Sequence, residues 1–279
     1  YKRILGQGGM GVVFKAYDKL LERDVAIKVL NEELRHNNEA QRIFLAEARS
    51  LATLKHPNLV TVHDVTTIDN VAMIVTEFVA GQNLEEYVRL NGGMDEDAVI
   101  KIAHQLAQAL SYMHERGMIH RDIKPGNLII REDGSLKVID FGLAKAENRV
   151  SRTRDGMVKG KLAYLSPEQA HGRPLDRRSD LFSLGVCAWE LLTGKRAFRR
   201  DDDRKTVLAI RAGKIDPPSR HAVVPEPLER IVGRLLATQL ELRYRTALEA
   251  REDLEAWQRQ GGPEFGRRNL SALMRSTFP

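Results

Sequence analysis

The sequence contains one cysteine, Cys187, which excludes an internal disulfide framework. Cys187 lies in the apolar run LFSLGVCAWELL, where we expect a buried core thiol rather than a reactive one. Unpaired thiols are typical of a reducing compartment, so we expect a cytoplasmic setting for this chain.

Long hydrophobic runs are also missing from the sequence. No apolar stretch reaches the roughly 18 residues of a membrane-spanning helix, and no signal peptide opens the chain. The chain begins at Tyr1 without an initiator methionine and enters a strand-like pattern within a few residues. We therefore expect a piece of a longer protein, in which any membrane anchor would lie elsewhere.

Aromatic residues make up only 6% of the chain, and they do not interleave with a basic stripe. The net charge of +6 would suit nucleic acid, but the basic residues are scattered and mix with acidic ones, as in RRDDDRK at 199–205. Such mixing favours a solvated surface, so we expect no nucleic-acid partner.

Hydrophobic patterning divides the 279 residues into a strand-rich first part and a helical second part. In the first part, VVFKAYD and DVAIKVL flank KLLER and predict an antiparallel hairpin. One helix is expected within 38–55, and HPNLVTVHDV and VAMIVTEFV predict two more strands. Beyond the turn-rich stretch 80–83, the segment 95–117 predicts a long helix capped by Gly117. The segment 179–194 is apolar nearly all round and predicts a central, buried helix.

Further helices are expected from Thr206, Glu226 and Ala247. The whole pattern predicts an α+β fold with a small β-rich N-lobe at 1–76, which has one main helix. A boundary at 77–83, which the family resemblance given below implies to be a hinge, would join it to a larger helical C-lobe at 84–260. The tail, 261–279, either docks on the large lobe or begins a linker. The residues that would dock are apolar: Leu270, Leu273, Met274 and Phe278.

The stretch GQGGMGVVFKAYD places Gly6, Gly8 and Gly11 on the spacing G-x-G-x-x-G. Glycine lets the backbone approach an anion closely and present its N–H groups. A dinucleotide fold needs a helix after these glycines, but VVFKAYD is a good strand, and no Walker A loop is present. What remains is a glycine-rich hairpin laid over phosphates, with a merely flexible hairpin as the alternative.

A phosphate site requires a cation, and Lys28 in VAIK stands on the next predicted strand, two positions from Ala26. A lysine in such an apolar strand needs a partner for its charge, and Glu47 on the predicted helix is the candidate. A solvated edge-strand lysine is the alternative interpretation of Lys28.

The stretch HRDIKPGN gathers chemistry-bearing residues directly after a predicted helix: His120, Arg121, Asp122, Lys124 and Asn127. The tripeptide DFG follows the apolar run LKVI and begins at Asp140. An aspartate at the end of a strand, before a glycine-hinged loop, is a good metal ligand, although DFG alone is uninformative.

In this order and spacing, these stretches resemble the signature set of the protein kinase superfamily over roughly residues 1–260. GQGGMGVV, HRDIKPGN and LSPEQA look most like the Ser/Thr kinases found in bacteria. The resemblance implies a bilobal protein-kinase fold. It also implies transfer of the γ-phosphate of ATP, bound with Mg²⁺, to Ser or Thr hydroxyls of protein substrates.

By this resemblance, Gly6, Gly8 and Gly11 cover the triphosphate, and Lys28, oriented by Glu47, holds the α- and β-phosphates. The hinge EFV binds adenine through backbone groups, behind a small gatekeeper threonine. The resemblance assigns the adenine site to Val13, Ala26, Thr76, Glu77, Val79 and Ile129.

Asp122 is implied to accept or orient the proton of the substrate hydroxyl. Lys124 is implied to reach the γ-phosphate, which favours a Ser or Thr acceptor over Tyr. Asn127 and Asp140 would hold two Mg²⁺ ions, since hard cations prefer oxygen ligands.

Other matches to the family are structural. Glu168 and Arg243 resemble the ion pair that ties the activation segment to the helical lobe, and Asp180 resembles the residue that braces the catalytic loop.

The sequence departs from the family pattern at two places. Lys161 occupies the position where Ser/Thr kinases usually carry Thr, which weakens the inference on substrate geometry. TQLELRY lacks the usual Asp-Pro near Arg243, so different packing is expected there.

Arg121 before the catalytic aspartate is typical of kinases that are switched by phosphorylation. We hypothesise that phosphate on Thr153, or secondarily on Ser151, pairs with Arg121 and orders the activation segment. The alternative is a pair of solvated hydroxyls in a basic loop. The resemblance also allows self-association, in which one copy phosphorylates another.

Two rival functions stay open at this point. A catalytically dead kinase fold could serve as a binding scaffold, although Lys28, Asp122, Asn127 and Asp140 are all retained. A kinase acting on a small-molecule hydroxyl or amino group is disfavoured by the long activation segment and by SPE at 166–168.

Overall fold

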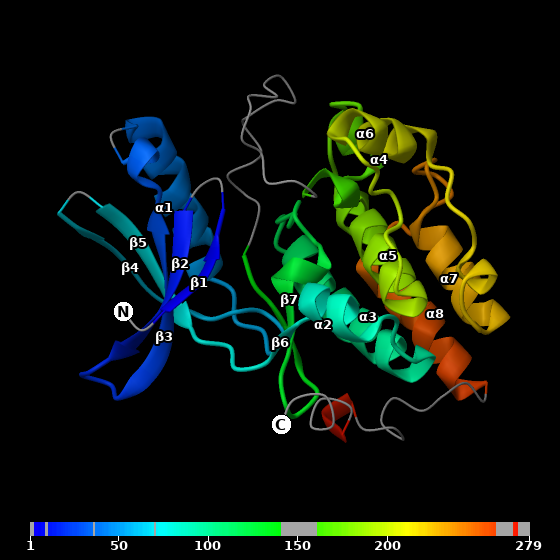
Figure 1. Cartoon of the computed structure of the whole chain (residues 1–279), viewed down its shortest axis with the longest axis horizontal. Helices are drawn as coiled ribbons and strands as arrows, with labels where there is room; N and C mark the ends of the chain where they lie inside the picture. The colour runs from blue at the N-terminus through cyan, green and yellow to red at the C-terminus, as the bar shows by residue number, and fades with distance from the viewer. Residues whose placement is uncertain are drawn as a thin grey trace. The chain divides into compact units, whose positions relative to one another are not determined.

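The computed structural model of the chain describes residues 3–8, 11–35, 37–69, 71–140, 161–260 and 270–272, with only the backbone described at Glu47 and Lys161. The described residues form two compact units, one up to Ala80 and one from Gly81 onward. The first unit is built mainly on a sheet and the second mainly on helices (Figure 1). The predicted α+β class is therefore confirmed, while the exact lobe and hinge boundaries stay predictions.

The first unit contains a five-stranded antiparallel sheet in the order β1-β2-β3-β5-β4, with one long helix, α1. Its elements are β1 (Arg3–Gln7), β2 (Gly11–Asp18), β3 (Arg23–Leu30), η1 (Glu32–Leu34), α1 (Asn38–Ala52), β4 (Val62–Ile68) and β5 (Val71–Glu77). The predicted hairpin is β2–β3. Strand β4 begins later than predicted, since Pro57 has no N–H and a turn closes from Leu59 N to His56 O at 3.1 Å.

Helix α1 begins where the Asn37 side chain accepts hydrogen bonds from the backbone N–H groups of Glu39 and Ala40, both at 3.0 Å. Such a cap satisfies donors that the first helical turn leaves without partners. Phe44 and Ala48 on α1 are fully buried and pack in one core with residues of the sheet. The sheet contributes Leu30, Ala72 and Ile74 to this core.

The second unit is helical, with a small antiparallel sheet in the order β6-β7-β8. Its helices are α2 (Leu84–Asn91), α3 (Glu96–His114), α4 (Pro167–Ala170), α5 (Arg178–Thr193), α6 (Asp203–Ala212), α7 (Glu226–Leu235) and α8 (Ala247–Arg259). Its strands are β6 (Gln82–Asn83), β7 (Leu128–Ile130) and β8 (Leu136–Val138). Short 3-10 turns are η2 (Pro125–Asn127), η4 (Lys161–Tyr164) and η5 (Pro218–Arg220).

Helix α5 is the central buried helix that the sequence predicts. Every residue from Ser179 to Leu192 is buried. Cys187 is 1% exposed, and burial raises the pKa of its thiol, so it is a core residue as expected. Helix α3 ends at His114, three residues before the predicted cap, Gly117, which has φ +73° in the turn that follows.

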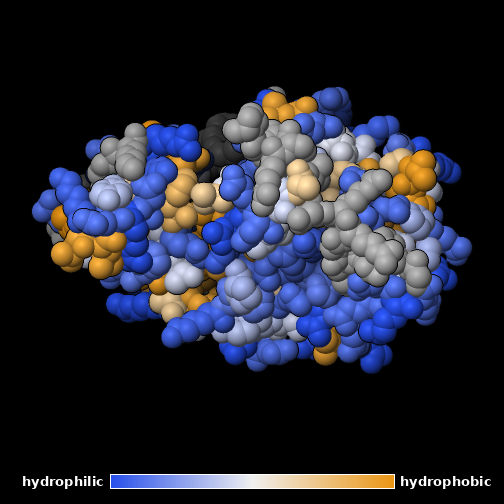
Figure 2. Space-filling model, turned by 90° about the horizontal axis from the view of Figure 1, so that it is seen from below, coloured by the Kyte–Doolittle hydropathy of each residue, from blue (hydrophilic) through white to orange (hydrophobic). Residues whose placement is uncertain are grey.

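The surface agrees with the composition. Figure 2 shows mainly hydrophilic residues on the face seen from below, with hydrophobic residues in separate groups. Among the helices that the structure describes, none is both long enough and apolar enough to cross a membrane.

Candidate functional site

Four predicted nucleotide-binding residues share one face of the five-stranded sheet. Val13 lies opposite Lys28 in the β2–β3 register, and Ala26 lies opposite Thr76 in the β3–β5 register. Directly opposite residues of antiparallel strands point to the same face, and residues two apart in one strand do so too. The structure thus brings Val13, Ala26, Lys28 and Thr76 to one side of the sheet.

Helix α1 covers this same face beside Lys28. Leu30 lies two positions after Lys28, and it packs against Phe44 and Ala48 of α1. Lys28 is therefore on the side of the sheet that faces the helix carrying Glu47. The side chain of Glu47 lies outside the described part of the chain, so its pairing with Lys28 stays a prediction.

The three glycines of the motif do different work. A Cβ on Gly11 would stand 2.3 Å from the carbonyl oxygen of Val29, so Gly11 lets β2 lie against β3. A Cβ on Gly6 would meet nothing within 4 Å. The carbonyl of Gly8 accepts a hydrogen bond from Asn31 Nδ2 at 3.0 Å, which ties the loop to the end of β3. Close packing therefore explains why a glycine is needed at Gly11, but it does not explain the glycines at Gly6 and Gly8.

The predicted hinge begins at the end of β5. The Glu77 side chain accepts a hydrogen bond from the backbone N–H of Thr61 at 2.8 Å, and the Glu77 N–H donates to Thr61 O at 2.9 Å. The hydroxyl of Thr76 donates to the carbonyl of Glu77 at 3.3 Å. Val79 is 9% exposed. These contacts fix the backbone that the resemblance assigns to adenine binding.

The predicted catalytic residues of the second unit come together around Asp122. Its Oδ2 accepts hydrogen bonds from Lys124 Nζ and from Asn127 Nδ2, each at 3.1 Å. Asn127 Nδ2 also lies 2.8 Å from the Asp122 carbonyl and 3.2 Å from the carbonyl of Asp140. One amide group therefore bridges the proposed base and the proposed metal-binding aspartate.

Asp140 and Asn127 are suited to a hard cation. The nitrogen of the Asn127 amide faces Asp122 and Asp140, which leaves the amide oxygen as the ligand atom. Asp140 has φ +55°, a strained backbone conformation of the kind that gathers at functional sites. Within the described ranges, no group of three or more His, Cys, Asp or Glu could hold a metal by itself. A donor set of one carboxylate and one amide suits Mg²⁺, which is usually completed by phosphates and water.

The loop that carries His120, Arg121 and Asp122 is anchored to α5 by Asp180, as predicted. Asp180 is 1% exposed, and its carboxylate accepts the backbone N–H groups of His120 and Arg121, both at 2.8 Å. Sequence reasoning missed a third contact, from His114 Nε2 at 2.8 Å. The sequence feature that could have revealed this contact is the position of His114, which ends an otherwise apolar helix face and precedes the loop.

Arg121 is held in an unusual conformation with φ +66°. Gln169 on α4 donates from Nε2 to the carbonyl of Arg121 at 3.3 Å, a contact that the sequence did not reveal. The Nε of Arg121 is a buried donor for which the described part of the chain supplies no hydrogen-bond partner. A buried, unpaired guanidinium donor is a suitable place for an anion.

Glu168 and Arg243 form the predicted ion pair. Arg243 NH1 lies 2.8 Å from Glu168 Oε1, and the two residues are 1% and 4% exposed. Ser179 Oγ donates to the same carboxylate at 2.7 Å. Burial by itself raises the pKa of Glu168, but the hydrogen bonds and charge of Arg243, with the Ser179 bond, bring the pKa below its ordinary value. The missing Asp-Pro does not prevent this pair.

A second charge network, centred on the buried Glu190, escaped the sequence analysis. Tyr164 OH donates to Glu190 Oε2 at 2.8 Å, and Arg196 contacts Glu190 at 3.1 Å and Glu85 at 3.0 Å. Arg196 also contacts the Tyr164 hydroxyl. Burial is the main reason that the pKa of Glu190 is raised. The network ties η4 and α2 to the central helix α5.

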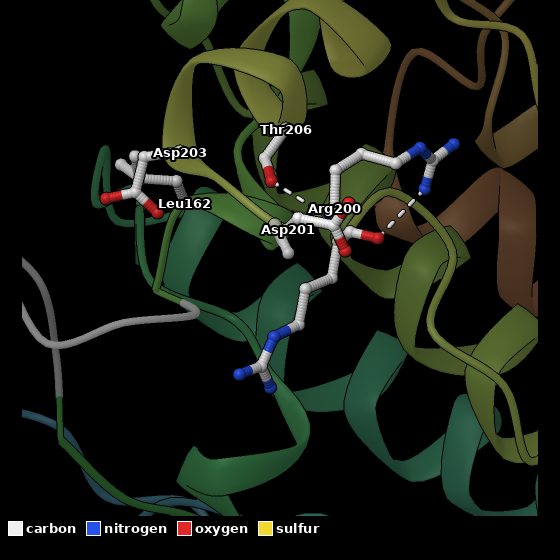
Figure 3. Close-up of a pocket in the computed structure, with 7 residues that line it drawn as sticks. Leu162, Arg200, Asp201, Asp203 and Thr206 are labelled. Carbon is white, nitrogen blue, oxygen red and sulfur yellow. Dashed lines mark hydrogen bonds between the residues drawn. The ribbon is translucent and has the colours of Figure 1, made fainter.

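A polar cavity of about 340 Å³ lies between η4 and the start of α6 (Figure 3). The Arg200 backbone N–H donates to Thr206 Oγ1 at 3.0 Å within it. Its lining consists of Leu162, Ala163, Arg199, Arg200, Asp201, Asp203 and Thr206. These are all different from the predicted nucleotide- and metal-binding residues, so the cavity is not assigned to the nucleotide.

The remaining predicted residues divide into two groups. Ile129 is described, lies on β7 and pairs with Lys137 of β8. Ser151, Thr153 and the Phe-Gly pair after Asp140 lie outside the described residues, as does the side chain of Lys161.

Comparison with known proteins agrees with this geometry. Residues 1–253 match the protein kinase domain family. The chain is 38% identical to the serine/threonine-protein kinase PrkC of Bacillus subtilis over 257 residues, which cover 91% of this chain and 39% of PrkC. It is 40% identical to the serine/threonine-protein kinase PknB of Mycobacterium leprae over 257 residues, covering 90% of this chain and 41% of that protein.

PknB of Mycobacterium tuberculosis is also 40% identical, over 258 residues that cover 90% of this chain and 41% of the relative. The chain thus spans about two fifths of the length of the curated relatives it matches. The family match takes in the glycine motif, the Asp122 cluster and the Glu168–Arg243 pair. The chain belongs to the protein kinase domain family.

Proposed function

We propose that this domain is a serine/threonine protein kinase that transfers the γ-phosphate of ATP, in the presence of Mg²⁺, to hydroxyl groups of protein substrates. The observation that carries the proposal is the contact set of Asp122, whose Oδ2 lies 3.1 Å from both Lys124 Nζ and Asn127 Nδ2. The names of the relatives support the choice of Ser and Thr as acceptors.

The chemistry follows from the charges in this cluster. Asp122 accepts or orients the proton of the incoming hydroxyl, since its carboxylate is held in place by two donors. Lys124 supplies a positive charge for the γ-phosphate oxygens, on which negative charge is spread in the transition state. Phosphoryl transfer needs little covalent help from a protein, so alignment and charge stabilisation are its main contributions.

Asn127 and Asp140 are the residues that would hold Mg²⁺, by the amide oxygen and the carboxylate. The bound ion supplies charge neutralisation for the phosphate oxygens. The protein contributes their spacing, since Asn127 Nδ2 lies 3.2 Å from the carbonyl of Asp140.

The first unit would supply the nucleotide contacts. Gly6, Gly8 and Gly11 would cover the phosphates, and Lys28 would bind the α- and β-phosphates. Val13, Ala26 and Thr76, on the same sheet face as Lys28, would line the adenine site. The family resemblance adds Ile129 to this set. The backbone of 77–79 would form the hinge that binds adenine.

A phosphate-transfer assay tests this function. Labelled ATP is incubated with the domain and a generic basic protein, with Mg²⁺ or with excess chelator, and the labelled amino acids are identified after acid hydrolysis. We expect Mg²⁺-dependent labelling of serine and threonine. If the domain binds ATP but labels the acceptor no more than the chelated control does, the kinase-fold scaffold is the correct interpretation.

Phosphorylation of the activation segment is proposed as the regulation of this site. Thr153→Ala is expected to lower transfer activity by at least about tenfold, because a phosphate next to Arg121 would form one to three charge-assisted hydrogen bonds. Ser151→Ala is expected to have a smaller effect. Initial rates and mass spectrometry of the active domain measure both.

A double-variant cycle gives this prediction its control. The losses of transfer activity in Arg121→Ala and Thr153→Ala should not add in the double variant, since both substitutions remove the same contact between Arg121 and the phosphate. Fully additive effects, or an active wild type without phosphate on Ser151 or Thr153, would contradict the proposed switch.

The proposal extends to the setting of the domain. Its substrates would be proteins with accessible Ser or Thr hydroxyls, and a second copy of the chain is one such substrate, through self-association. The domain would act in the cytoplasm as part of a longer protein.

A further inference from the structure

The hairpin β7–β8 carries both proposed metal ligands at its open end. Asn127 directly precedes β7, and Asp140 follows β8 by two residues. The two ends are joined where the Ile139 N–H donates to the carbonyl of Asn127 at 2.8 Å. Both proposed ligands are therefore held at the same end of the hairpin.

The opposite end of the hairpin is a tight turn over Arg131–Ser135. The turn is closed by hydrogen bonds from Arg131 N to Ser135 O and from Gly134 N to Arg131 O, each at 2.9 Å. Gln105 of α3 holds both sides of the turn. Its Nε2 donates to Gly134 O at 3.2 Å, and its Oε1 accepts from Leu136 N at 2.8 Å.

The C-terminal segment 270–272 contacts this turn. Leu270 is 1% exposed and Ser271 is 5% exposed, although both come from a short helical piece far beyond α8. A Cβ placed on Gly134 would stand 3.1 Å from Ser271 N and 3.2 Å from Leu270 Cβ. Figure 1 draws the red segment beside the end of the green hairpin.

We propose that the turn of the β7–β8 hairpin is a docking surface for the chain's own segment 270–272, and that this docking orders the hairpin as far as Asn127 and Asp140. Leu270 is the apolar anchor, since its burial is the main free-energy gain open to such a short piece. Gly134 is the matching feature of the turn, because it leaves the space that Leu270 and Ser271 fill. The consequence for catalysis rests on the proposed function, whereas the docking does not.

Hydrogen exchange of the backbone amides tests the docking without nucleotide or substrate. Leu270→Asp would place a charge where the side chain is 1% exposed, and Ala272→Asp places the same charge on an exposed residue of the same segment. We expect exchange at Leu136 and Ile139 to rise by about tenfold to a hundredfold in Leu270→Asp. Ala272→Asp should exchange as the wild type does.

The glycine of the turn gives a second, independent pair of variants. Gly134 and Gly117 have φ of +77° and +73°, so alanine strains the backbone at both positions. Only in Gly134→Ala would the added Cβ also stand 3.1 Å from Ser271 N and 3.2 Å from Leu270 Cβ, so the segment would have to shift. We expect Gly134→Ala to speed proteolytic cleavage within 261–279 by at least about tenfold, and Gly117→Ala to leave it unchanged.

Three results would overturn the proposal. One is unchanged exchange in Leu270→Asp, and another is an equal change in Ala272→Asp. The third is faster exchange at the turn while Ile139 stays as protected as in the wild type, since the docking would then not reach the metal ligands. An inactive wild type in the transfer assay would refute the proposed kinase function and leave these exchange results standing.

Discussion

Asp122→Asn is expected to lower kcat for phosphoryl transfer by about 10²- to 10⁴-fold, the usual contribution of a positioned acid or base. Asparagine keeps the size of the side chain and can still accept hydrogen bonds from Lys124 and Asn127, which both contact Oδ2 in the wild type. It lacks the negative charge and the basicity that the incoming hydroxyl requires. The loss should therefore fall on the chemical step rather than on nucleotide binding.

Steady-state kinetics and nucleotide-binding titrations measure the two effects separately. We expect the affinity for ATP to stay close to that of the wild type while kcat falls. Asp216→Asn is the matched control, since Asp216 lies at the surface and pairs with Arg220 at 2.9 Å. If Asp122→Asn kept more than a tenth of the wild-type kcat, Asp122 would not be the residue that handles the proton.

Arg243→Ala is expected to destabilise the second unit by about 3–5 kcal/mol, the usual cost of leaving one partner of a buried ion pair alone. Arg243 donates to Glu168, to the carbonyl of Arg178 at 2.8 Å and to the carbonyl of Ala237 at 2.9 Å. Its removal leaves the Glu168 carboxylate buried with only Ser179 as a side-chain donor among the hydrogen bonds of the described residues.

Urea unfolding measures this loss of stability, and the way the loss changes with pH identifies the charge of Glu168 as its cause. The pair lowers the pKa of Glu168 in the folded wild type. Its contribution is complete above the unfolded-state pKa of about 4.3 and is lost as pH falls through the folded-state value. In Arg243→Ala, burial instead raises the pKa of Glu168, so protonation relieves the variant. The deficit should thus be largest at neutral pH, should already shrink as pH falls toward about 4.3, and should shrink further below it as the wild type loses its own contribution.

Two comparisons control for a general loss of packing. Arg42→Ala breaks an exposed pair with Glu39, whose side chains are 73% and 55% exposed, and should cost less than about 1 kcal/mol. Combining Glu168→Gln with Arg243→Met should cost less than the sum of the single changes, since no buried charge is left. A pH-independent deficit would show that the charge of Glu168 is not what matters.

Periodicity predicted the elements that a local pattern of apolar residues defines. These elements are the hairpin β2–β3, helices α1 and α3, and the fully buried helix α5. The cluster around Asp122 was predictable because its members lie within six residues, from Asp122 to Asn127. Asp180 and the Glu168–Arg243 pair came from the family resemblance rather than from any local pattern.

The contacts that escaped prediction join residues far apart in the chain. His114 reaches Asp180, and Arg196 reaches Glu85. Neither pair leaves a periodic trace, since each needs the fold to bring two distant polar side chains together. The late start of β4 has a local cause, the turn at His56–Leu59, which the β-branched pattern of the segment concealed.

The anchor at Asp180 has a consequence for the proposed switch. The carboxylate of Asp180 grips the peptide amides of His120 and Arg121 rather than their side chains. A substitution of Arg121 therefore removes its guanidinium but keeps the backbone hydrogen bonds that hold the loop to α5. In the proposed switch, the residue that meets the phosphate can thus change while the loop that carries Asp122 stays attached to α5.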